Sequence, residues 1–222
     1  MRVVAVIPAF NEEARVANVV RDAQRYVDTV IVIDDGSVDQ TAARAGEAGA
    51  LVLKHAENCG AGAATMTGIH AARRLGAGAL ITLDADEQHD PADIPELLRP
   101  IAEQRADIVF ANRFGQRNRI PLIRRFFNTA GNFITFFATG MWVHDSQCGF
   151  KALGPRAINE MDVRMSGYEF CSEMVREAAQ HRWRIAQLPV KVIYSEYTLA
   201  KGQSFAGGVR TAFKILIRSF LR

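Results

Sequence analysis

The chain has 222 residues, of which 49% are hydrophobic and 23% charged, and its formal net charge is +3. This composition is that of a globular protein and argues against intrinsic disorder, while the length suits one large domain over residues 1–222. The net charge is too small to indicate nucleic acid, and we expect no nucleic-acid partner.

The first half of the chain alternates runs rich in Val and Ile with segments of helical pattern. Strands are expected at residues 2–10, 29–37, 51–55, 79–86 and 107–113. Helices are expected at 11–26, capped by Asn11, at 39–49, capped by Ser37 or Asp39, and at 62–76 and 90–104. Runs of β-branched residues without polar alternation are typical of strands covered on both faces. The sequence therefore predicts an α/β fold with a mostly parallel, doubly wound sheet and right-handed crossovers.

The second half of the chain has a different pattern. A Phe-rich helical segment at 120–143 is followed by a polar loop at 144–154, a helix at 168–181 and a strand at 184–194. Arg124 and Arg125 interrupt the Phe-rich segment, so we do not expect it to span a membrane. The N-terminal apolar run breaks at Pro8, too early for a signal peptide, and the chain is expected to begin directly with a strand.

Polar residues collect at the carboxyl ends of the predicted strands, where open α/β sheets bind ligands. Each of the first four strands ends in such residues: Asn11 and Glu12, then Asp34 and Asp35, then Asn58, Gly60 and Gly62, and finally Asp84 and Asp86. A single polar strand end is typical of a loop. Four at one edge of a sheet predict a binding site.

Asp84 and Asp86 are two residues apart, so their side chains point the same way in an extended segment. Two neighbouring carboxylates repel each other unless a cation or a shared proton relieves the repulsion. Oxygen ligands suit Mg²⁺ or Mn²⁺, with positions left for phosphate oxygens. A solvated turn or a cap for the following helix is the alternative interpretation of this pair.

The segments VIPAFNEE, VIDDGSVDQT, NCGAGAA, LDADEQHDP and DSQCGFKAL occur here in the order found in family 2 glycosyltransferases. The chain resembles this family, which has the GT-A fold, over nearly its whole length. It is most similar to the branch of dolichyl-phosphate mannose synthase and polyprenyl-phosphate glycosyltransferases. The resemblance implies a nucleotide-diphospho-sugar donor, Mg²⁺ or Mn²⁺, and inversion at the anomeric carbon.

The resemblance also implies roles for particular residues. Asp84 would face the ribose and sugar, while Asp86 and Gln88 would hold the metal. The nucleoside pocket would be formed by Pro8, Phe10, Glu12 and Asp35. Glu87 and Asp90 depart from the family pattern, and we interpret both as lying outside the metal site.

A lipid-phosphate acceptor is already an anionic nucleophile, so its transfer needs positive charge more than a strong base. In the branch that the chain resembles, Arg113, Arg125 and Lys201 match the positions that contact phosphates, while Asn128 replaces an expected Ser. The residues give no reason to prefer Arg125 over Arg124. A surface ion pair is the alternative role for Arg113.

Asp145 lies closest to the place where this family binds the sugar or the attacking group, and we include it with Asp84 and Asp86 in the predicted catalytic set. For a hydroxyl acceptor, Asp145 or Glu173 would be the candidate base, although a loop-capping role for Asp145 is nearly as strong an interpretation. His89 is expected to be a surface residue or to support the site indirectly rather than to bind metal.

The three cysteines form no C-x-x-C pair, which argues against a disulfide framework and a thiolate zinc site and fits a reducing cytosol. Of these, Cys148 and Cys171 are expected to be packing residues.

The C-terminal segment favours a lipid partner. Four basic residues recur at every fourth position and would line one helical face among large apolar groups: Arg210, Lys214, Arg218 and Arg222. Such a helix suits anionic lipid headgroups, although a helix docked on the domain with a solvated basic edge is the alternative. Together with the Phe-rich segment, it predicts peripheral association with the inner, cytoplasmic face of the membrane.

The leading functional hypothesis is sugar transfer from a donor of the GDP-mannose or UDP-glucose type to a polyprenyl or dolichyl phosphate. Residues 1–113 would bind the donor, and residues 114–222 would face the acceptor and membrane. Transfer to a hydroxyl acceptor in envelope polysaccharide or glycolipid synthesis is the nearest alternative. A sugar nucleotidyltransferase is disfavoured because no basic, Gly-rich loop follows the first strand. A non-catalytic nucleotide-sugar-binding protein is the last alternative.

Overall fold

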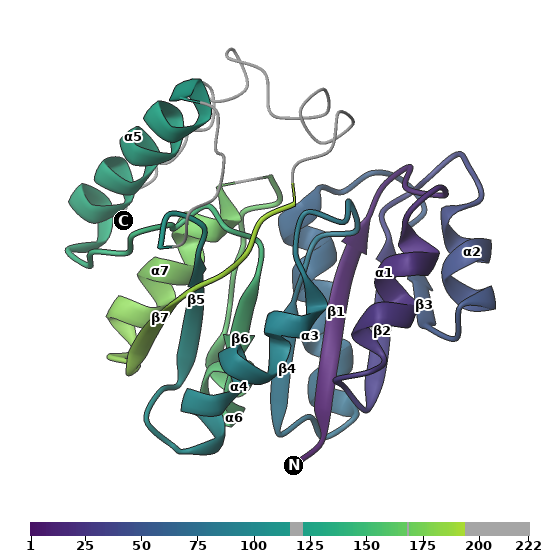
Figure 1. Ribbon diagram of the computed structural model, residues 1–222, viewed down its shortest axis with the longest axis horizontal. Helices are drawn as coiled ribbons and strands as arrows, with labels where there is room; N and C mark the ends of the chain where they lie inside the picture. Colours follow the sequence, from purple (N-terminus) through teal and green to yellow (C-terminus); the bar gives the residue numbers. More distant parts are fainter. Residues whose placement is uncertain (116–121, 168, 194–222) are drawn as a thin grey trace.

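The computed structural model describes residues 1–115, 122–167 and 169–193. Within them the strands form one sheet in the order β3-β2-β1-β4-β6-β5-β7 (Figure 1). The strands are β1 (Val3–Ala9), β2 (Thr29–Asp34), β3 (Leu51–Lys54), β4 (Ala79–Thr82), β5 (Ile108–Asn112), β6 (Lys151–Leu153) and β7 (Ile185–Pro189). Neighbouring strands from β3 to β4 pair in parallel, as do β5 and β7, whereas β6 is antiparallel to both of its neighbours. The mostly parallel sheet predicted from the sequence is confirmed.

Helices cover both faces of the sheet. They are α1 (Val16–Ala23), α2 (Thr41–Glu47), α3 (Ala61–Arg74), the 3-10 helix η1 (Pro91–Asp93), α4 (Ile94–Ala102), α5 (Leu122–Thr139), α6 (Pro155–Glu160) and α7 (Phe170–Gln180). Alternate strand residues enter two apolar layers, since Val4 and Val6 pack with α3, α6 and α7, while Ala5 and Ile7 pack with α1, α2 and α4. This two-sided burial explains the unbroken apolar runs in the sequence.

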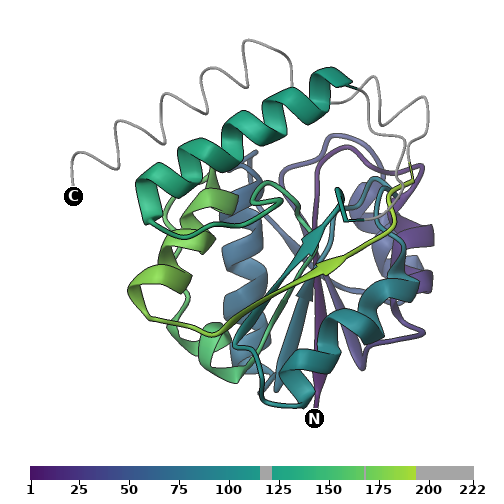
Figure 2. The ribbon, with the colours of Figure 1, turned by 60° about the vertical axis from the view of Figure 1, so that its left-hand side comes forward.

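Helix α5 lies outside these two layers. It packs against α7 and lies at the end of the molecule towards which β1 runs (Figures 1 and 2). None of the helices among the described residues is long and apolar enough to cross a membrane.

The structure corrects three local predictions. Asn11 does not cap a helix, because α1 begins only at Val16; Asn11 instead has a φ of 54° and its side-chain oxygen accepts the Val38 N–H at 3.1 Å. The second helix begins at Thr41 after Gln40, although Asp39 accepts the Thr41 N–H at 2.9 Å. The polar loop predicted at 144–154 ends instead in β6, which inserts between β4 and β5.

Candidate active site

The parallel pairing brings the polar strand ends to one edge of the sheet. In the register of the sheet, Ala9 at the end of β1 lies opposite Asp34 of β2. The Asp35 N–H donates to the Ala9 carbonyl at 2.8 Å, and the Leu83 N–H donates to the Val6 carbonyl at 3.2 Å. The ends of β1, β2 and β4 therefore meet at the carboxyl edge, as the sequence predicted.

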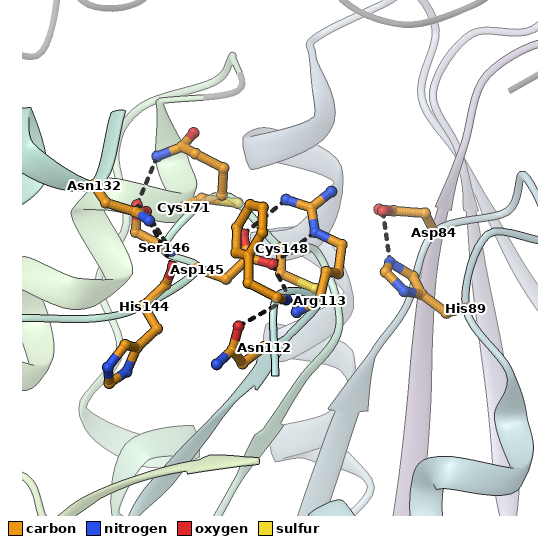
Figure 3. Close-up of polar contacts among 12 residues, drawn as sticks. Asp84, His89, Asn112, Arg113, Asn132, His144, Asp145, Ser146, Cys148 and Cys171 are labelled. Atoms are coloured by element: carbon orange, nitrogen blue, oxygen red, sulfur yellow. Dashed lines mark hydrogen bonds and ion pairs between the residues drawn. The ribbon is translucent and has the colours of Figure 1, made fainter. Parts of the chain in front are cut away.

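Asp84 is held by His89 at this edge (Figure 3). The Nε2 atom of His89 lies 3.1 Å from Oδ2 of Asp84, and the imidazole is buried with its ring centroid 5.0 Å from that of Phe150. The Asp84 side chain itself is 50% exposed. Desolvation would raise the pKa of Asp84, but the hydrogen bond with His89 and the charges of His89, Lys151 and Arg113 hold that pKa below its ordinary value. Of the two sequence interpretations of His89, the structure supports an indirect role in the site.

Gly149 lies directly against the Asp84 carboxylate. A Cβ atom added at Gly149 would be 2.5 Å from both carboxylate oxygens, a distance that no side chain tolerates. The carbonyl oxygen of Gly149 accepts the Thr82 hydroxyl at 2.6 Å, which ties this backbone to the end of β4. Asp84 is therefore confined by His89 on one side and by glycine backbone on another.

Asp86 and Gln88 form a second polar pair in the same loop. The side-chain nitrogen Nε2 of Gln88 donates to Oδ2 of Asp86 at 2.6 Å, and the backbone N–H of Gln88 donates to Oδ1 of Asp86 at 3.1 Å. Desolvation, followed by the negative charge of Asp84, raises the pKa of Asp86. The negative charge of Asp84 thus disfavours ionisation of Asp86, and the carboxylate of Asp86 and the side-chain oxygen of Gln88 are ligand types that suit Mg²⁺ or Mn²⁺.

The residues that depart from the family pattern brace the loop. Glu87 has a φ of 63°, and its carboxylate accepts the Asn18 side-chain amide at 3.0 Å and lies 3.8 Å from Arg15. Asp90 caps η1 by accepting the Ala92 N–H at 3.0 Å. Both side chains therefore bind protein groups, and their position outside the metal set stays a prediction.

The chain that follows β7 crosses this loop. The Ile193 N–H donates to the Gln88 carbonyl at 3.0 Å, and the Lys191 N–H donates to Asp93 at 3.0 Å. His89 and Val192 form an antiparallel bridge. Residues 191–193 are thus fastened to the loop that carries Asp86 and to the helix η1 that follows it.

Asp35 is buried, and both of its oxygens accept hydrogen bonds. Oδ1 lies 2.7 Å from Nδ1 of His55 and accepts the Cys59 N–H at 3.0 Å, while Oδ2 accepts the Gly60 N–H at 2.7 Å. The end of β3 and the loop before α3 are therefore fixed on the end of β2.

The other residues predicted to line the nucleoside pocket lie near the end of β1. Pro8 belongs to the strand, Phe10 follows it and is exposed, and Glu12 is buried with its N–H donating to the Thr41 hydroxyl at 2.8 Å. The fold therefore brings the four predicted pocket residues to neighbouring strand ends, while their contact with a nucleoside stays a prediction.

Arg113 and Asp145 form a buried, two-pronged ion pair (Figure 3). Nε of Arg113 donates to Oδ2 of Asp145 at 2.7 Å, Nη2 donates to Oδ1 at 2.8 Å, and the Arg113 N–H adds a third bond at 3.0 Å. The loop is held in turn by Asn132, whose side-chain oxygen accepts the N–H and the hydroxyl of Ser146, each at 2.9 Å. The pair is not at the surface, and the predicted roles of Arg113 towards phosphate and of Asp145 in catalysis stay predictions.

Glu173, the second candidate base, is also occupied by structural contacts. It is buried in α7, accepts the Arg164 and Met165 N–H groups at 2.9 and 2.7 Å, and pairs with Arg176. Its carboxylate fixes the segment before α7.

Lys151 is a charged residue of this region to which the sequence analysis assigns no role. It is fully buried in β6; its ammonium donates to the Cys148 carbonyl, lies 3.4 Å from the Cys171 sulfur and stands 5.7 Å from the centre of the Phe170 ring. Its position between Phe150 and Ala152 in an apolar run was the available signal. Burial raises the pKa of Cys148 to about 12, so this cysteine is a thiol, and both it and Cys171 are packing residues as predicted.

The structure gives no test of the other basic residues predicted to contact phosphate or lipid. Lys201 and the basic C-terminal segment lie outside the described residues, as does the side chain of Arg124. Arg125 is exposed on α5, and its backbone carbonyl accepts the Thr129 hydroxyl at 2.8 Å. The choice between Arg124 and Arg125 therefore stays open.

The mostly parallel sheet with one inserted antiparallel strand is the arrangement of the GT-A fold, and a D-x-D pair follows its strand β4. Residues 4–161 match the family model described as Glycosyl transferase family 2, and the chain belongs to this family. It is therefore an enzyme that transfers sugars, and the predicted family and fold are confirmed.

Relatives cover almost the whole chain. It is 33% identical to the UDP-N-acetylglucosamine--dolichyl-phosphate N-acetylglucosaminyltransferase of Methanococcus voltae, across 96% of this chain and 94% of that protein. It is 26% identical to the polyprenol monophosphomannose synthase of Mycolicibacterium smegmatis, across 96% and 85%. In fold it is similar to glucosyl-3-phosphoglycerate synthase from Mycobacterium tuberculosis, crystallised with Mn²⁺, UDP and glucosyl-3-phosphoglycerate, with a TM-score of 0.72, 20% identity and coverage of 98% and 79%.

Proposed function

We propose that the enzyme transfers a sugar from a nucleotide-diphospho-sugar to a polyprenyl or dolichyl phosphate, with inversion and with the aid of Mg²⁺ or Mn²⁺. The observation that carries the proposal is the position of Asp84 and Asp86 two residues apart at the carboxyl edge of the sheet, where desolvation and then the charge of Asp84 raise the pKa of Asp86. A divalent cation would relieve this repulsion and would also bind a diphosphate. The names of the two relatives supply the acceptor class.

In this proposal, residues at different strand ends bind different parts of the donor. Asp86 and Gln88 hold the cation, which when bound stabilises the negative charge of the departing nucleoside diphosphate. Asp84, confined by His89 and Gly149, orients the ribose and sugar. The nucleoside lies among Pro8, Phe10, Glu12 and Asp35.

The state of the two candidate bases favours a phosphate acceptor. Both oxygens of Asp145 accept hydrogen bonds from Arg113, and the Glu173 oxygens bind backbone N–H groups and Arg176. Either carboxylate would have to give up charge-assisted contacts of this kind in order to reach a hydroxyl acceptor. A lipid phosphate needs no such base. Arg113, Arg125 and Lys201 would supply the positive charge that brings two anionic partners together.

We propose peripheral membrane association through α5 and the segment after it, at the cytoplasmic face. Phe133, Phe137 and Trp142 are 49%, 78% and 39% exposed, an arrangement that suits the boundary between water and lipid. In this proposal residues 114–222 form the half that faces acceptor and membrane, and residues 1–113 the half that binds donor.

A donor panel tests the proposal. The panel consists of UDP-N-acetylglucosamine, UDP-glucose and GDP-mannose, each with Mn²⁺ or Mg²⁺ and a polyprenyl phosphate. We expect one donor to give a lipid-linked sugar, with product lost in chelator and in Asp86→Ala. Transfer to an oligosaccharide hydroxyl but to no polyprenyl phosphate would instead establish the alternative acceptor class.

A further inference from the structure

Three side chains with different metal-binding atoms converge at the ends of β2 and β3, away from the D-x-D pair. One ligand atom from each of Asp35, His55 and Cys59 lies within 4.8 Å of the other two. We propose that these three residues form a second cation site, selective for Zn²⁺, in the donor half of the enzyme.

The fold fixes the positions of two ligands independently of any ion. Asp35 is buried, and its carboxylate accepts the N–H groups of Cys59 and Gly60 at 3.0 and 2.7 Å. Gly60 has a φ of 95°, and a Cβ atom there would lie 2.4 Å from the Ser166 carbonyl, so this backbone is held tightly. Because the Cys59 main chain is bound to Asp35, its sulfur stays beside the carboxylate.

His55 is oriented from both ring nitrogens. Nδ1 lies 2.7 Å from Asp35, and Nε2 lies 3.0 Å from the hydroxyl of Thr67 on α3. The 2.7 Å contact is a hydrogen bond, so a bound ion would take the place of its proton: Nε2–H would then donate to Thr67 and the unprotonated Nδ1 would be the metal ligand. A hydrogen-bond partner on the second nitrogen is the usual companion of a metal-binding histidine, and Thr67 provides it.

The chemistry of the three atoms selects the cation. A thiolate sulfur, an imidazole nitrogen and a carboxylate oxygen together suit Zn²⁺, whereas Mg²⁺ and Mn²⁺ prefer oxygen ligands. The Cys59 thiol lies 3.5 Å from the Glu57 carbonyl and is exposed, so its proton can leave to solvent as the ion binds. Three protein ligands leave one position of a tetrahedral ion for water.

This site is distinct from the one at Asp86. Asp35 follows β2 and Asp84 follows β4, with β1 between them, so about 10 Å separates the two strand ends at ordinary strand spacing. One consequence rests on the proposed function: because Asp35 is assigned to the nucleoside pocket, Zn²⁺ bound there competes with the sugar donor. The site would make the transferase sensitive to zinc.

Co²⁺ is the probe that distinguishes the proposed zinc site, which contains a thiolate, from the proposed site at Asp86, which contains only oxygen ligands. We expect Co²⁺ added to the full-length protein to give a thiolate-to-cobalt charge-transfer absorption that equimolar Zn²⁺ abolishes. Cys59→Ser, which keeps the backbone bonds to Asp35, should lose this absorption and bind Zn²⁺ more than about tenfold more weakly. Asp86→Ala is the matched control and should keep the absorption unchanged.

The outcomes distinguish the two proposals. Absence of the charge-transfer band in the native protein, or its persistence in Cys59→Ser, would overturn the zinc site whatever the enzyme transfers. In the activity arm, micromolar Zn²⁺ should raise the donor KM of the native enzyme and leave that of Cys59→Ser unchanged. A band that depends on Cys59, together with no transfer from any donor, would retain the zinc site and reject the proposed acceptor chemistry.

Discussion

Asp86 is the residue on which the proposed metal chemistry depends most. In the proposed site Asp86 would bind the cation through its carboxylate, and it also accepts a hydrogen bond from the side-chain nitrogen of Gln88, the other proposed ligand. We expect Asp86→Ala to lower kcat by about 10²–10³-fold, the usual effect of losing one group that stabilises developing charge. Radiolabelled lipid-linked sugar measures the loss. Asp90→Asn, which retains the oxygen that caps η1, is the control and should stay within a factor of a few of the native rate.

Gly149 offers a sharper test of how Asp84 is used, because it carries no functional group. Gly149→Ala would bring a methyl group to 2.5 Å from both Asp84 oxygens and force the carboxylate to move. We expect a fall in kcat/KM of at least about tenfold, since small displacements of positioned groups are costly. Gly46→Ala in α2, where a Cβ meets only Val52 at 3.9 Å, should leave activity unchanged. Equal losses in both variants would show that Asp84 is not the cause.

His89 acts on Asp84 through one hydrogen bond, so the two residues should not behave independently. His89→Leu and Asp84→Asn should each reduce turnover, while the double variant should be little worse than Asp84→Asn alone. Such non-additivity is the signature of residues in direct contact, and a double-mutant cycle on kcat/KM measures it. Fully additive losses would mean that His89 supports the fold and not the carboxylate.

Strands β5 and β7 are joined by an ion pair between Asp107 and Arg184, the residues that precede them. Asp107 accepts the Arg184 N–H at 2.8 Å and two guanidinium bonds at 3.1 and 2.9 Å. These bonds, above all those from the Arg184 side chain, lower the pKa of Asp107 despite desolvation. A carboxyl whose pKa is lower in the folded state stabilises the fold above its unfolded pKa, and this stability is lost as pH falls through the folded pKa.

Asp107→Asn should therefore destabilise the protein at neutral pH by about 1–2 kcal/mol, the usual cost of hydrogen bonds to a charged group. The difference from the native protein should shrink progressively below about pH 4, where the unfolded carboxyl takes up its proton. Urea unfolding at a series of pH values measures both. A difference that is constant with pH would exclude Asp107 as the titrating group.

The elements that the sequence predicted well are those with a strong local pattern. Runs such as residues 29–34 are apolar on both faces and long enough to indicate buried strands. Strand β6 has only three residues and pairs with β4 and β5, which are distant in the sequence, so no local periodicity marks it. The same holds for Asn11, whose side chain is engaged by the loop after β2 and not by the helix that follows it.

In the candidate site, too, the residues within one segment could be predicted from the sequence, whereas contacts between distant segments could not. Asp84 and Asp86 are predicted from their place in one segment at a strand end, and Gln88 from the resemblance of that segment to the family motif. The Arg113–Asp145 pair joins residues 32 apart in the sequence, and the contact of His89 with Asp84 depends on how the loop folds back. Residue type and spacing do not predict such contacts, because they depend on how distant segments pack in the fold.

For the molecule as a whole, the proposed function places donor and acceptor at one end. The sheet delivers the acidic strand ends there, and α5 lies at the same end outside the two helical layers (Figure 2). A water-soluble nucleotide sugar and a membrane-bound phosphate could reach such a site from different sides. Under the proposed membrane association, the surface around α5 would face the bilayer.

The exposed aromatic residues of that surface allow the orientation to be tested. Phe137 is 78% exposed, and Trp142 packs edge-on against Phe133 and Phe136 at centroid distances of 5.2 and 5.7 Å. Burying such rings in lipid stabilises association by about 1.5–3 kcal/mol for each side chain fully buried. Phe137→Ser with Trp142→Ser should thus weaken binding to anionic vesicles by at least about tenfold, measured by co-sedimentation.

The double variant should retain transfer to a short-chain, water-soluble polyprenyl phosphate, since neither ring belongs to the proposed donor site. Tyr26→Ser removes an exposed aromatic ring from the region between α1 and β2, at the opposite edge of the sheet, and should bind vesicles as the native enzyme does. Equal binding by all three proteins would mean that the membrane lies against another face.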